Sequence, residues 1–235
     1  MHPLVNIALR AGRDAAGVLA QQSERLDRIR VVETEAGQQV TSVEADSDKS
    51  LLYHIRAAYP NHHVNSRVSG EHPGKPGEPT WHLDPAIGMD NLLYGFPAFG
   101  VAVAIEISNK INHAAVLFPA LQEEFTASRG SGAQLNARRL RVRTGDELKN
   151  ALIGVNPADL DAALLTALIR ELIGKEGQFR ALGDTTLDIL QVAAGRYSGG
   201  WGRASSGPGL QAALLVLQEA GGLAGTHTGR PSPGA

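Results

Sequence analysis

The sequence predicts a mixed α+β and α/β protein, in which an antiparallel sheet is followed by a second set of helices and strands. Apolar residues recur at helical spacing over residues 2–22, near the N-terminus, and over 158–173. Between these helices, residues 99–107, 111–118 and 123–127 are β-rich stretches separated by short turns, as expected for an antiparallel sheet. Strands and helices then alternate towards the C-terminus, which is typical of a further α/β layer.

The composition is that of a globular protein with a sizeable core. The chain has 235 residues, of which 43% are hydrophobic, and this is enough for one large domain or two small ones. Because cysteine is absent, disulfides, thiolate nucleophiles and cysteine-based metal centres are excluded. The net charge of -2 gives no general electrostatic reason to bind nucleic acid or an anionic membrane.

No segment of the sequence is expected to enter a membrane or to direct export. No apolar run approaches the roughly 20 residues that span a bilayer. Residues 1–13 lack the basic region and the apolar block of a secretory signal. We therefore expect a cytoplasmic protein without membrane contacts.

The first part of the chain should contain two helices. The apolar stripe over residues 2–22 predicts the first of them, and residues 28–39 alternate as a strand pair or an extended loop would. The second helix should run over about 46–59, with Asp46 or Ser47 as its N-cap.

A strand should then lead to a turn in the stretch 81–99. Residues 63–69 predict a short extended segment, and the Gly- and Pro-rich residues 71–80 predict an exposed loop. Pro85 lacks a backbone N–H and keeps Asp84 out of the helical region, so the strand is expected to stop there. Asp84 would thus be presented at a strand end, where chemistry is common in α/β folds.

Basic residues follow the expected sheet. Arg139, Arg141 and Arg143 alternate with apolar residues, and a strand would place all three on one face, next to Arg138. They could bind an acidic partner or RNA, or they could be the solvated side of an edge strand, where basic residues discourage aggregation. Because the chain is not basic overall, the edge strand is the favoured interpretation.

The second part of the chain is expected to be mainly helical. Helices are predicted over residues 158–173, 183–194 and 210–220, the last closed by a pair of glycines. We divide the chain into residues 1–145, with the helix pair and the antiparallel sheet, and residues 146–225, with the second α/β layer of the same unit. Residues 226–235 predict a disordered tail.

Five blocks of sequence, in order, resemble the inositol monophosphatase family. One of these blocks, at residues 84–91, reads Asp-Pro-Ala-Ile-Gly-Met-Asp-Asn, where the family has Asp-Pro-Leu/Ile-Asp-Gly-Thr-Thr-Asn. The others are the opening of the chain and the regions 127–136, 183–195 and 214–222. The resemblance implies a layered αβαβα fold, here shortened at its C-terminus, and a family chemistry in which Mg²⁺ assists the hydrolysis of phosphate monoesters such as inositol monophosphates.

The opening Met-His-Pro-x-x-Asn-Ile-Ala-x-Arg-Ala is similar to the bacterial SuhB branch of this family. That branch is associated with transcription antitermination, through Nus factors and RNA polymerase. The resemblance therefore implies these partners, and it also implies a homodimer.

The metal ligands of the family are not all retained. Its four carboxylates come from a Gly-Glu-Glu block, from both Asp residues of Asp-Pro-x-Asp-Gly-Thr, and from a later Trp-Asp. By position they fall on Arg67, Asp84, Ile87 and Gly209, so that only Asp84 keeps a carboxylate and a guanidinium is added. Such a set should not hold two or three Mg²⁺ ions, so we expect no cofactor, or Mg²⁺ only if the site has been rebuilt.

Other functional positions of the family have changed as well. The Thr that helps to activate water falls on Met89, the Glu that contacts the inositol ring falls on Gly202, and an upstream Asp falls on Glu44, which can still accept a proton. Glu44 and Asp84 are therefore remnants of a catalytic set. The remnants of the substrate loop are Gly88, Met89, Asp90 and Thr185.

Two roles are open for Asp84. Arg67 could occupy the vacated site and pair with it, because a guanidinium and a carboxylate form a good bidentate pair. Alternatively, Asp84 could be a strand-end acid that caps backbone N–H groups. Neither role is catalytic.

Three functions remain open. The favoured hypothesis is a SuhB-like homologue that has lost Mg²⁺-dependent phosphatase activity and acts as a binding protein in antitermination. The alternative is an active inositol-1-monophosphatase with an altered site, in which Glu44, Asp90 and Asp184 supply oxygens. A decayed gene product is the third, although the intact helical and strand patterns indicate that the chain still folds.

Overall fold

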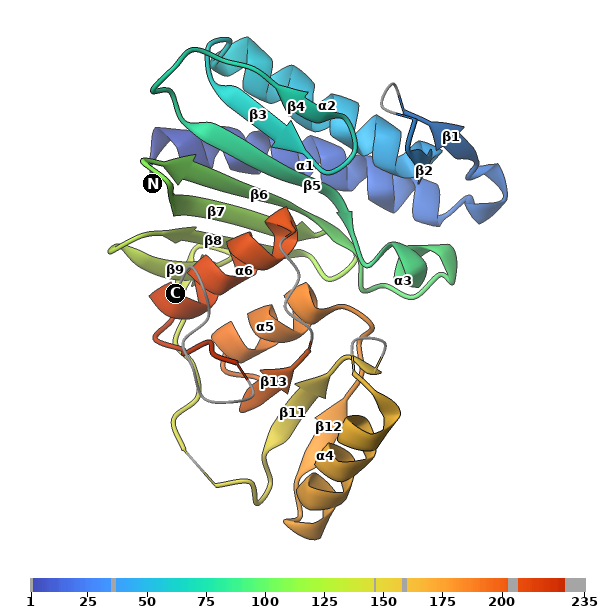
Figure 1. Cartoon of the computed structure of the whole chain (residues 1–235), viewed down its shortest axis with the longest axis vertical. Helices are drawn as coiled ribbons and strands as arrows, with labels where there is room; N and C mark the ends of the chain where they lie inside the picture. Colours follow the sequence, from blue (N-terminus) through green and yellow to red (C-terminus); the bar gives the residue numbers. More distant parts are fainter. Residues whose placement is uncertain (1, 35–36, 146, 158–159, 203–206, 227–235) are drawn as a thin grey trace.

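The central sheet of the protein separates two hydrophobic cores (Figure 1). In this computed structural model the described residues are 2–34, 37–145, 147–157, 160–202 and 207–226. Eight strands lie in the order β10-β9-β8-β7-β6-β5-β3-β4. They are β3 (His63–Ser66), β4 (Gly70–His72), β5 (Thr80–Ile87), β6 (Gly100–Ile107), β7 (Lys110–Phe118), β8 (Glu123–Ser128), β9 (Gly132–Leu135) and β10 (Arg138–Arg139).

Alternation along β6 shows how the sheet supplies both cores. Val101, Val103 and Ile105 pack in one cluster of buried residues, whereas Ala102 and Ala104 pack in the other. This follows from the strand geometry, because successive side chains point to opposite faces. The predicted strands β6, β7 and β8 are thus confirmed, and β6 and β7 are joined by the expected tight turn.

One layer of helices covers each face of this sheet (Figure 1). On one face lie α1 (Pro3–Ser23) and α2 (Ser42–Ala58), which confirms the predicted helix pair. On the other face lies α6 (Pro208–Glu219), with α5 (Thr185–Ala193) beside it. The short elements η1 (Leu26–Arg28), β1 (Val31–Glu33) and β2 (Gln39–Thr41) join the first two helices, and α3 (Met89–Leu93) follows β5.

A second sheet lies beyond α5 and completes the layering. It has the order β12-β11-β13, with parallel pairing between β11 (Leu152–Val155) and both β12 (Gln178–Arg180) and β13 (Gly199–Trp201). The helix α4 (Ala162–Gly174) packs on its outer side (Figure 1). The succession of helix, sheet, helix, sheet and helix is the αβαβα arrangement that the sequence resemblance implied.

The start of α2 differs from the prediction. Neither Asp46 nor Ser47 is the N-cap, because Thr41 caps the helix and forms a reciprocal capping box with Glu44. The helix therefore begins at Ser42, and the Ser47 hydroxyl is buried and donates to the Pro85 carbonyl at 2.6 Å. The capping box, rather than the first polar residue of the apolar stripe, sets the helix start.

The strand around Pro85 also differs from the prediction. β5 does not stop at Asp84 but continues to Ile87, with a shift of register between these two residues. The irregularity accommodates a proline, which cannot donate to the ladder. The predicted loop after Ser69 is also partly a strand, because β4 pairs with β3.

Other expectations are met only in part. The arginine-rich stretch forms a strand at Arg138 and Arg139 alone, at the edge of the large sheet. The predicted helix over 158–173 begins at Ala162, and residues 158 and 159 lie outside the described part of the chain, as does the predicted tail beyond Thr226. No helix among the described residues is long and apolar enough to span a bilayer.

Candidate functional site

Arg67 bridges two carboxylates at the position where the resemblance implied a metal. Its Nε donates to Asp84 Oδ1 at 2.8 Å, and its Nη2 donates to Glu44 Oε1 at 3.0 Å. Nη2 also donates to the Ala86 carbonyl at 3.0 Å. The structure therefore brings Arg67 to Asp84, as the pairing hypothesis expected, but the guanidinium is shared between two acids rather than bound twice by one.

The backbone fixes Arg67 in this place. It follows the last residue of β3, and its N–H donates to the Leu83 carbonyl at 3.0 Å, which continues the parallel pairing of β3 with β5. Ser66 secures the turn, since its hydroxyl accepts from the N–H of Val68 and donates to the buried Asp48. Arg67 thus points across β5 because the strand pairing places its backbone there.

The charges of two largely buried acids favour the bridge. Asp84 and Glu44 are largely buried, with 13% and 9% of their side chains exposed, whereas Arg67 is 33% exposed. Burial opposes the charge of Arg67, but the carboxylates of Asp84 and Glu44 outweigh it and raise the pKa of the guanidinium above its ordinary value. Arg67 is therefore a permanent cation between two acids.

Glu44 has a second role in the same site. Its other oxygen, Oε2, accepts from the Thr41 N–H at 2.8 Å and from the Thr41 hydroxyl at 2.9 Å. Both oxygens are thus engaged, one by the helix cap and one by Arg67. Among the described residues, no backbone N–H donates to Asp84, so the alternative role of Asp84 as a turn cap finds no support there.

The other carried-over positions converge on Asp84. A Cβ at Gly209, in the first turn of α6, would lie 2.9 Å from Asp84 Oδ2 and 3.4 Å from Ile87 Cγ1. Gly209 therefore brings the backbone of α6 against the acid. Ile87 is buried in the core beneath α6. The sequence resemblance assigned Arg67, Asp84, Ile87 and Gly209 to one site, and the structure places them side by side.

The loop after β5 provides no further oxygen at this point. Gly88 has φ +65°, a left-handed conformation that favours glycine, and its N–H donates to Asp184 Oδ2 at 3.2 Å. Met89 packs against the first core, with its Sδ 3.9 Å from the Thr41 hydroxyl, whereas Asp90 is exposed. The three residues are neighbours in sequence but face different surroundings.

Asp184 is used as the cap of α5. Its Oδ1 accepts from the N–H of Thr186 at 2.8 Å and of Leu187 at 3.3 Å. Burial raises the pKa of Asp184, the cap bonds lower it, and the charge of Asp84 raises it further. Thr185 follows in the first turn of α5, and Gly202 lies so close to it that a Cβ there would overlap the Thr185 hydroxyl. Thr185 of the remnant substrate loop and Gly202, at the position of the ring-contacting Glu, therefore lie together.

The residues present do not fit a multinuclear magnesium site. Asp84 is the single carboxylate at the four ligand positions, and one of its oxygens is bound by Arg67. Within the described residues, no group of three His, Asp or Glu side chains is placed to hold a metal ion. The proposed rebuilt set also does not assemble, because Glu44 is bound by Arg67, Asp90 is exposed and Asp184 caps a helix. Mg²⁺ needs several oxygens in near-octahedral geometry, which this arrangement does not supply.

A buried acid that the sequence analysis did not single out lies near this site. Asp188 of α5 is 2% exposed, and neither of its oxygens has a hydrogen-bond partner among the described residues. Burial raises its pKa to about 7, with a further contribution from the charge of Asp184. The signal in the sequence was one acid inside an otherwise apolar helical stretch, Leu-Asp-Ile-Leu.

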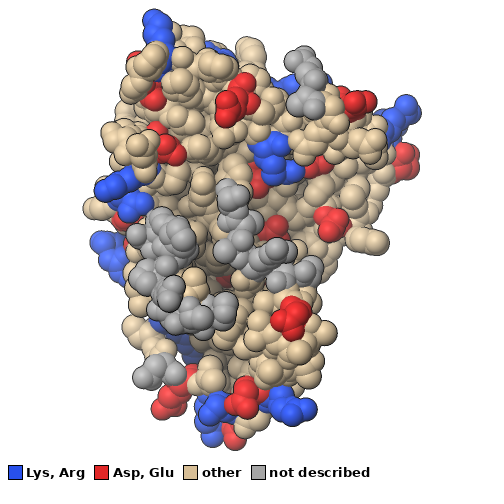
Figure 2. All heavy atoms as spheres, viewed as in Figure 1, with Lys and Arg blue, Asp and Glu red and all other residues tan. Residues whose placement is uncertain are grey.

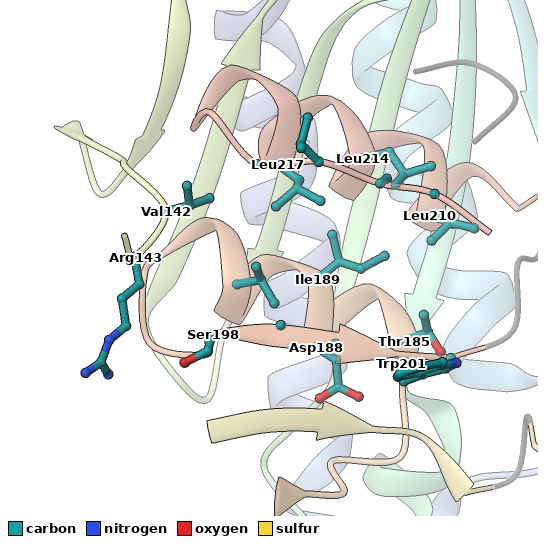
Figure 3. Close-up of a pocket in the computed structure, with 18 of the residues that line it drawn as sticks. Val142, Arg143, Thr185, Asp188, Ile189, Ser198, Trp201, Leu210, Leu214 and Leu217 are labelled. Carbon is teal, nitrogen blue, oxygen red and sulfur yellow. The ribbon is translucent and has the colours of Figure 1, made fainter. Parts of the chain in front are cut away.

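Asp188 lines a cavity of about 480 Å³ between α5, α6 and β13 (Figure 3). Figure 3 shows Leu210, Leu214 and Leu217 of α6 along one side, while Asp188 points away from them towards β11. There it lies against Gly154, where a Cβ would be 2.9 Å from its carboxylate. The missing side chain at Gly154 thus leaves the room that the acid occupies.

The adjacent histidines have structural roles. His62 Nδ1 accepts the indole N–H of the buried Trp81 at 2.9 Å. His63 Nδ1 accepts the N–H of Gly74 at 3.0 Å, and its Nε2 lies 2.9 Å from the Lys75 carbonyl. The ring nitrogens of this pair are therefore used to hold the loop before β5.

Comparisons with known proteins identify the family and the fold. The sequence model of the inositol monophosphatase family matches residues 1–233. The Nus factor SuhB of Pseudomonas aeruginosa is 40% identical to this chain, over 97% of the chain and 87% of that protein. Among solved structures, the extragenic suppressor protein suhB of Bartonella henselae is similar with a TM-score of 0.85 and 27% identity, covering 94% of this chain and 86% of that chain. An IMPase of Thermotoga maritima has the same fold, with a TM-score of 0.83 at 23% identity over 99% of this chain and 89% of that chain.

Proposed function

Since the chain belongs to the inositol monophosphatase family, we propose that it acts as a SuhB-like binding protein in transcription antitermination and has lost Mg²⁺-dependent phosphatase activity. By analogy with the relatives named Nus factor SuhB, its partners are Nus factors and RNA polymerase in the cytoplasm. The chain acts as a homodimer in this proposal.

The observation that carries the proposal is the bridge made by Arg67. In a metal-dependent phosphatase the cations clamp the phosphate, lower the pKa of a bound water and stabilise the leaving oxygen. A guanidinium between Glu44 and Asp84 has a fixed charge, but it has no open coordination position at which a water could be activated. In this proposal, the bridge stabilises the fold and takes the place of the metal ions that hydrolysis would require.

A binding role is further supported by an exposed apolar surface beside this site. The last residue of α3, Leu93, is 41% exposed, and the C-cap residue, Tyr94, is 89% exposed. Phe96, two residues further on, is 46% exposed. Leu26 adds a fourth exposed apolar side chain, and it lies next to Gly95. Clusters of exposed aromatic and aliphatic side chains commonly mark protein interfaces.

The first experiment measures hydrolysis of inositol 1-phosphate over a series of Mg²⁺ concentrations, together with the melting temperature. The proposal expects no turnover and no Mg²⁺-dependent rise in Tm. Turnover that depends on Mg²⁺ and is lost in Asp84→Asn would contradict it, and would support the alternative of an inositol-1-monophosphatase with an altered site.

A restored variant makes this test sharper. The triple substitution Arg67→Glu, Ile87→Asp and Gly209→Asp returns carboxylates to the three altered ligand positions around Asp84. We expect calorimetry to detect Mg²⁺ binding to this variant but not to the natural chain, because hard cations require such oxygens. Equal Mg²⁺ binding by both proteins would mean that the ligands lie elsewhere.

The partner is tested by affinity capture with purified Nus factors and RNA polymerase. Capture by the natural chain and its loss in Tyr94→Ser would support a binding role for the surface around α3. Light scattering on the same two proteins measures whether the chain is a dimer. Absence of capture under all conditions would leave the fold without the proposed function.

A further inference from the structure

A row of exposed arginines begins in the edge strand of the large sheet and continues beyond it. We call Arg138, Arg139, Arg141 and Arg143 the arginine ladder. All four are exposed, and among the described residues no carboxylate forms an ion pair with any of them. Lys and Arg side chains gather on the same side of the molecule, along the left edge of the face in Figure 2, at the height of β8 and β9 in Figure 1.

Backbone hydrogen bonds hold the segment of the arginine ladder against the protein. Leu140 is 7% exposed and its N–H donates to the Ala133 carbonyl at 2.8 Å, while the N–H of Val142 donates to the Ala220 carbonyl at 3.1 Å. These inward residues alternate with Arg139, Arg141 and Arg143, which are exposed, and Arg138 precedes them in the edge strand. Successive alternate residues of an extended chain are about 6.6 Å apart, which sets a regular spacing of positive charge.

Among the described residues, the carboxylates of the neighbouring elements β8 and α6 form no ion pair with the arginine ladder, because they are bound elsewhere. Their partners are Arg196 for Glu123, Arg13 for Glu124, and the backbone N–H groups of Gly130 and Gly132 for Glu219.

The surroundings distinguish a nucleic acid from an acidic protein. A protein interface normally has an apolar core with aromatic or aliphatic anchors. None of the large exposed hydrophobic residues of the described chain falls within residues 122–147. Trp201 and Leu223, which line a cavity together with Arg143, lie at one end of the arginine ladder only. A phosphate backbone requires only regularly placed cations, and the planar fork of arginine matches phosphate oxygens well.

From this arrangement we propose that the arginine ladder binds the phosphate backbone of a single-stranded nucleic acid, without reading its sequence. This surface lies apart from Arg67 and Asp84. Nucleic-acid binding at this surface does not depend on whether the chain hydrolyses phosphate esters. A failure of the RNA-binding proposal would therefore leave the Mg²⁺ test of the proposed function unaffected, and a failure of the Mg²⁺ test would leave the RNA-binding proposal unaffected.

The test uses a fluorescein-labelled RNA of mixed sequence, titrated with the full chain at several salt concentrations. The natural chain is compared with the triple substitution Arg139→Gln, Arg141→Gln and Arg143→Gln. The control substitutes Arg25→Gln, Arg28→Gln and Arg30→Gln, which removes the same charge from exposed positions near η1. Thermal unfolding of all three proteins shows that the fold is retained.

The ladder variant is expected to bind about tenfold more weakly at low salt, and the slope of log K against log salt should fall by about 2, since each single-strand contact contributes about 0.7. The control should bind as the natural chain does. Equal effects of the two variants, or no RNA binding by the natural chain, would overturn the proposal. Displacement of the RNA by polyglutamate of matched charge, with equal efficiency to unlabelled RNA, would also overturn it in favour of an acidic protein.

Discussion

Removal of Arg67 should destabilise the protein far more than removal of a comparable surface arginine. Arg67→Ala deletes charge-assisted hydrogen bonds to Asp84 and Glu44 and one bond to the Ala86 carbonyl. Hydrogen bonds to charged groups contribute about 1.5–3 kcal/mol each. Since one third of the Arg67 side chain is exposed, we take the lower end of this range and expect a loss of about 3 kcal/mol. The two acids would also be left facing each other without a cation.

Urea unfolding at neutral pH measures this loss, and thermal unfolding should show a decrease of Tm of about 10 °C. The matched control is Arg13→Ala, because Arg13 makes two bonds of 2.7 Å to Glu124 but is 58% exposed. That pair should contribute less than about 1 kcal/mol. If Arg67→Ala lowers the free energy of unfolding by no more than Arg13→Ala does, the bridge does not stabilise the site.

Three further predictions concern single positions. Burial raises the pKa of Asp188 to about 7, so the folded state keeps a proton that the unfolded chain has released. The free energy of unfolding should therefore fall by up to about 4 kcal/mol as pH rises from 4 to above 7. A series of Tm measurements over this pH range should show the decrease in the natural chain but not in Asp188→Asn. Burial lowers the pKa of His62, whose Nδ1 accepts the indole N–H of Trp81. Stability should therefore be lost as pH falls below about 6.5, with a change in tryptophan fluorescence. His62→Gln keeps a hydrogen-bond acceptor but does not titrate, so it should not show this change. Gly209→Ala places a Cβ 2.9 Å from Asp84 Oδ2 and should destabilise by about 1–3 kcal/mol in urea unfolding, whereas an unchanged midpoint would show that α6 can shift away.

The regular elements of this fold were predictable where one local signal dominated. The apolar stripe of α1 and the alternation of β6 and β7 each gave an element whose ends differ little from the structure. The predicted start of α2 was wrong because the capping box at Thr41 precedes the apolar stripe and places the first helical residue at Ser42. The end of β5 was wrong because a tertiary bond from Ser47 stabilises the strand around a proline that would otherwise end it.

The site could be predicted in its chemistry but not in its partners. A guanidinium next to the remaining acid predicted the contact between Arg67 and Asp84. The second acid, Glu44, lies 23 residues before Arg67, and only the packing of α2 on β5 brings the two together. The burial of Asp188 could not be predicted, because it depends on the close approach of Gly154 in another sheet.

The bridge at Arg67 also constrains how the chain could acquire the ligand set of its family during evolution. Asp at position 87 would replace a side chain that is 3% exposed in the core, and Asp at position 209 would crowd Asp84. Each of these changes is unfavourable while a guanidinium already satisfies the site, and loss of Arg67 alone leaves two acids unpaired. Each of these three single substitutions towards the family's ligand set therefore begins with a less stable protein, so the present arrangement is easier to keep than to leave.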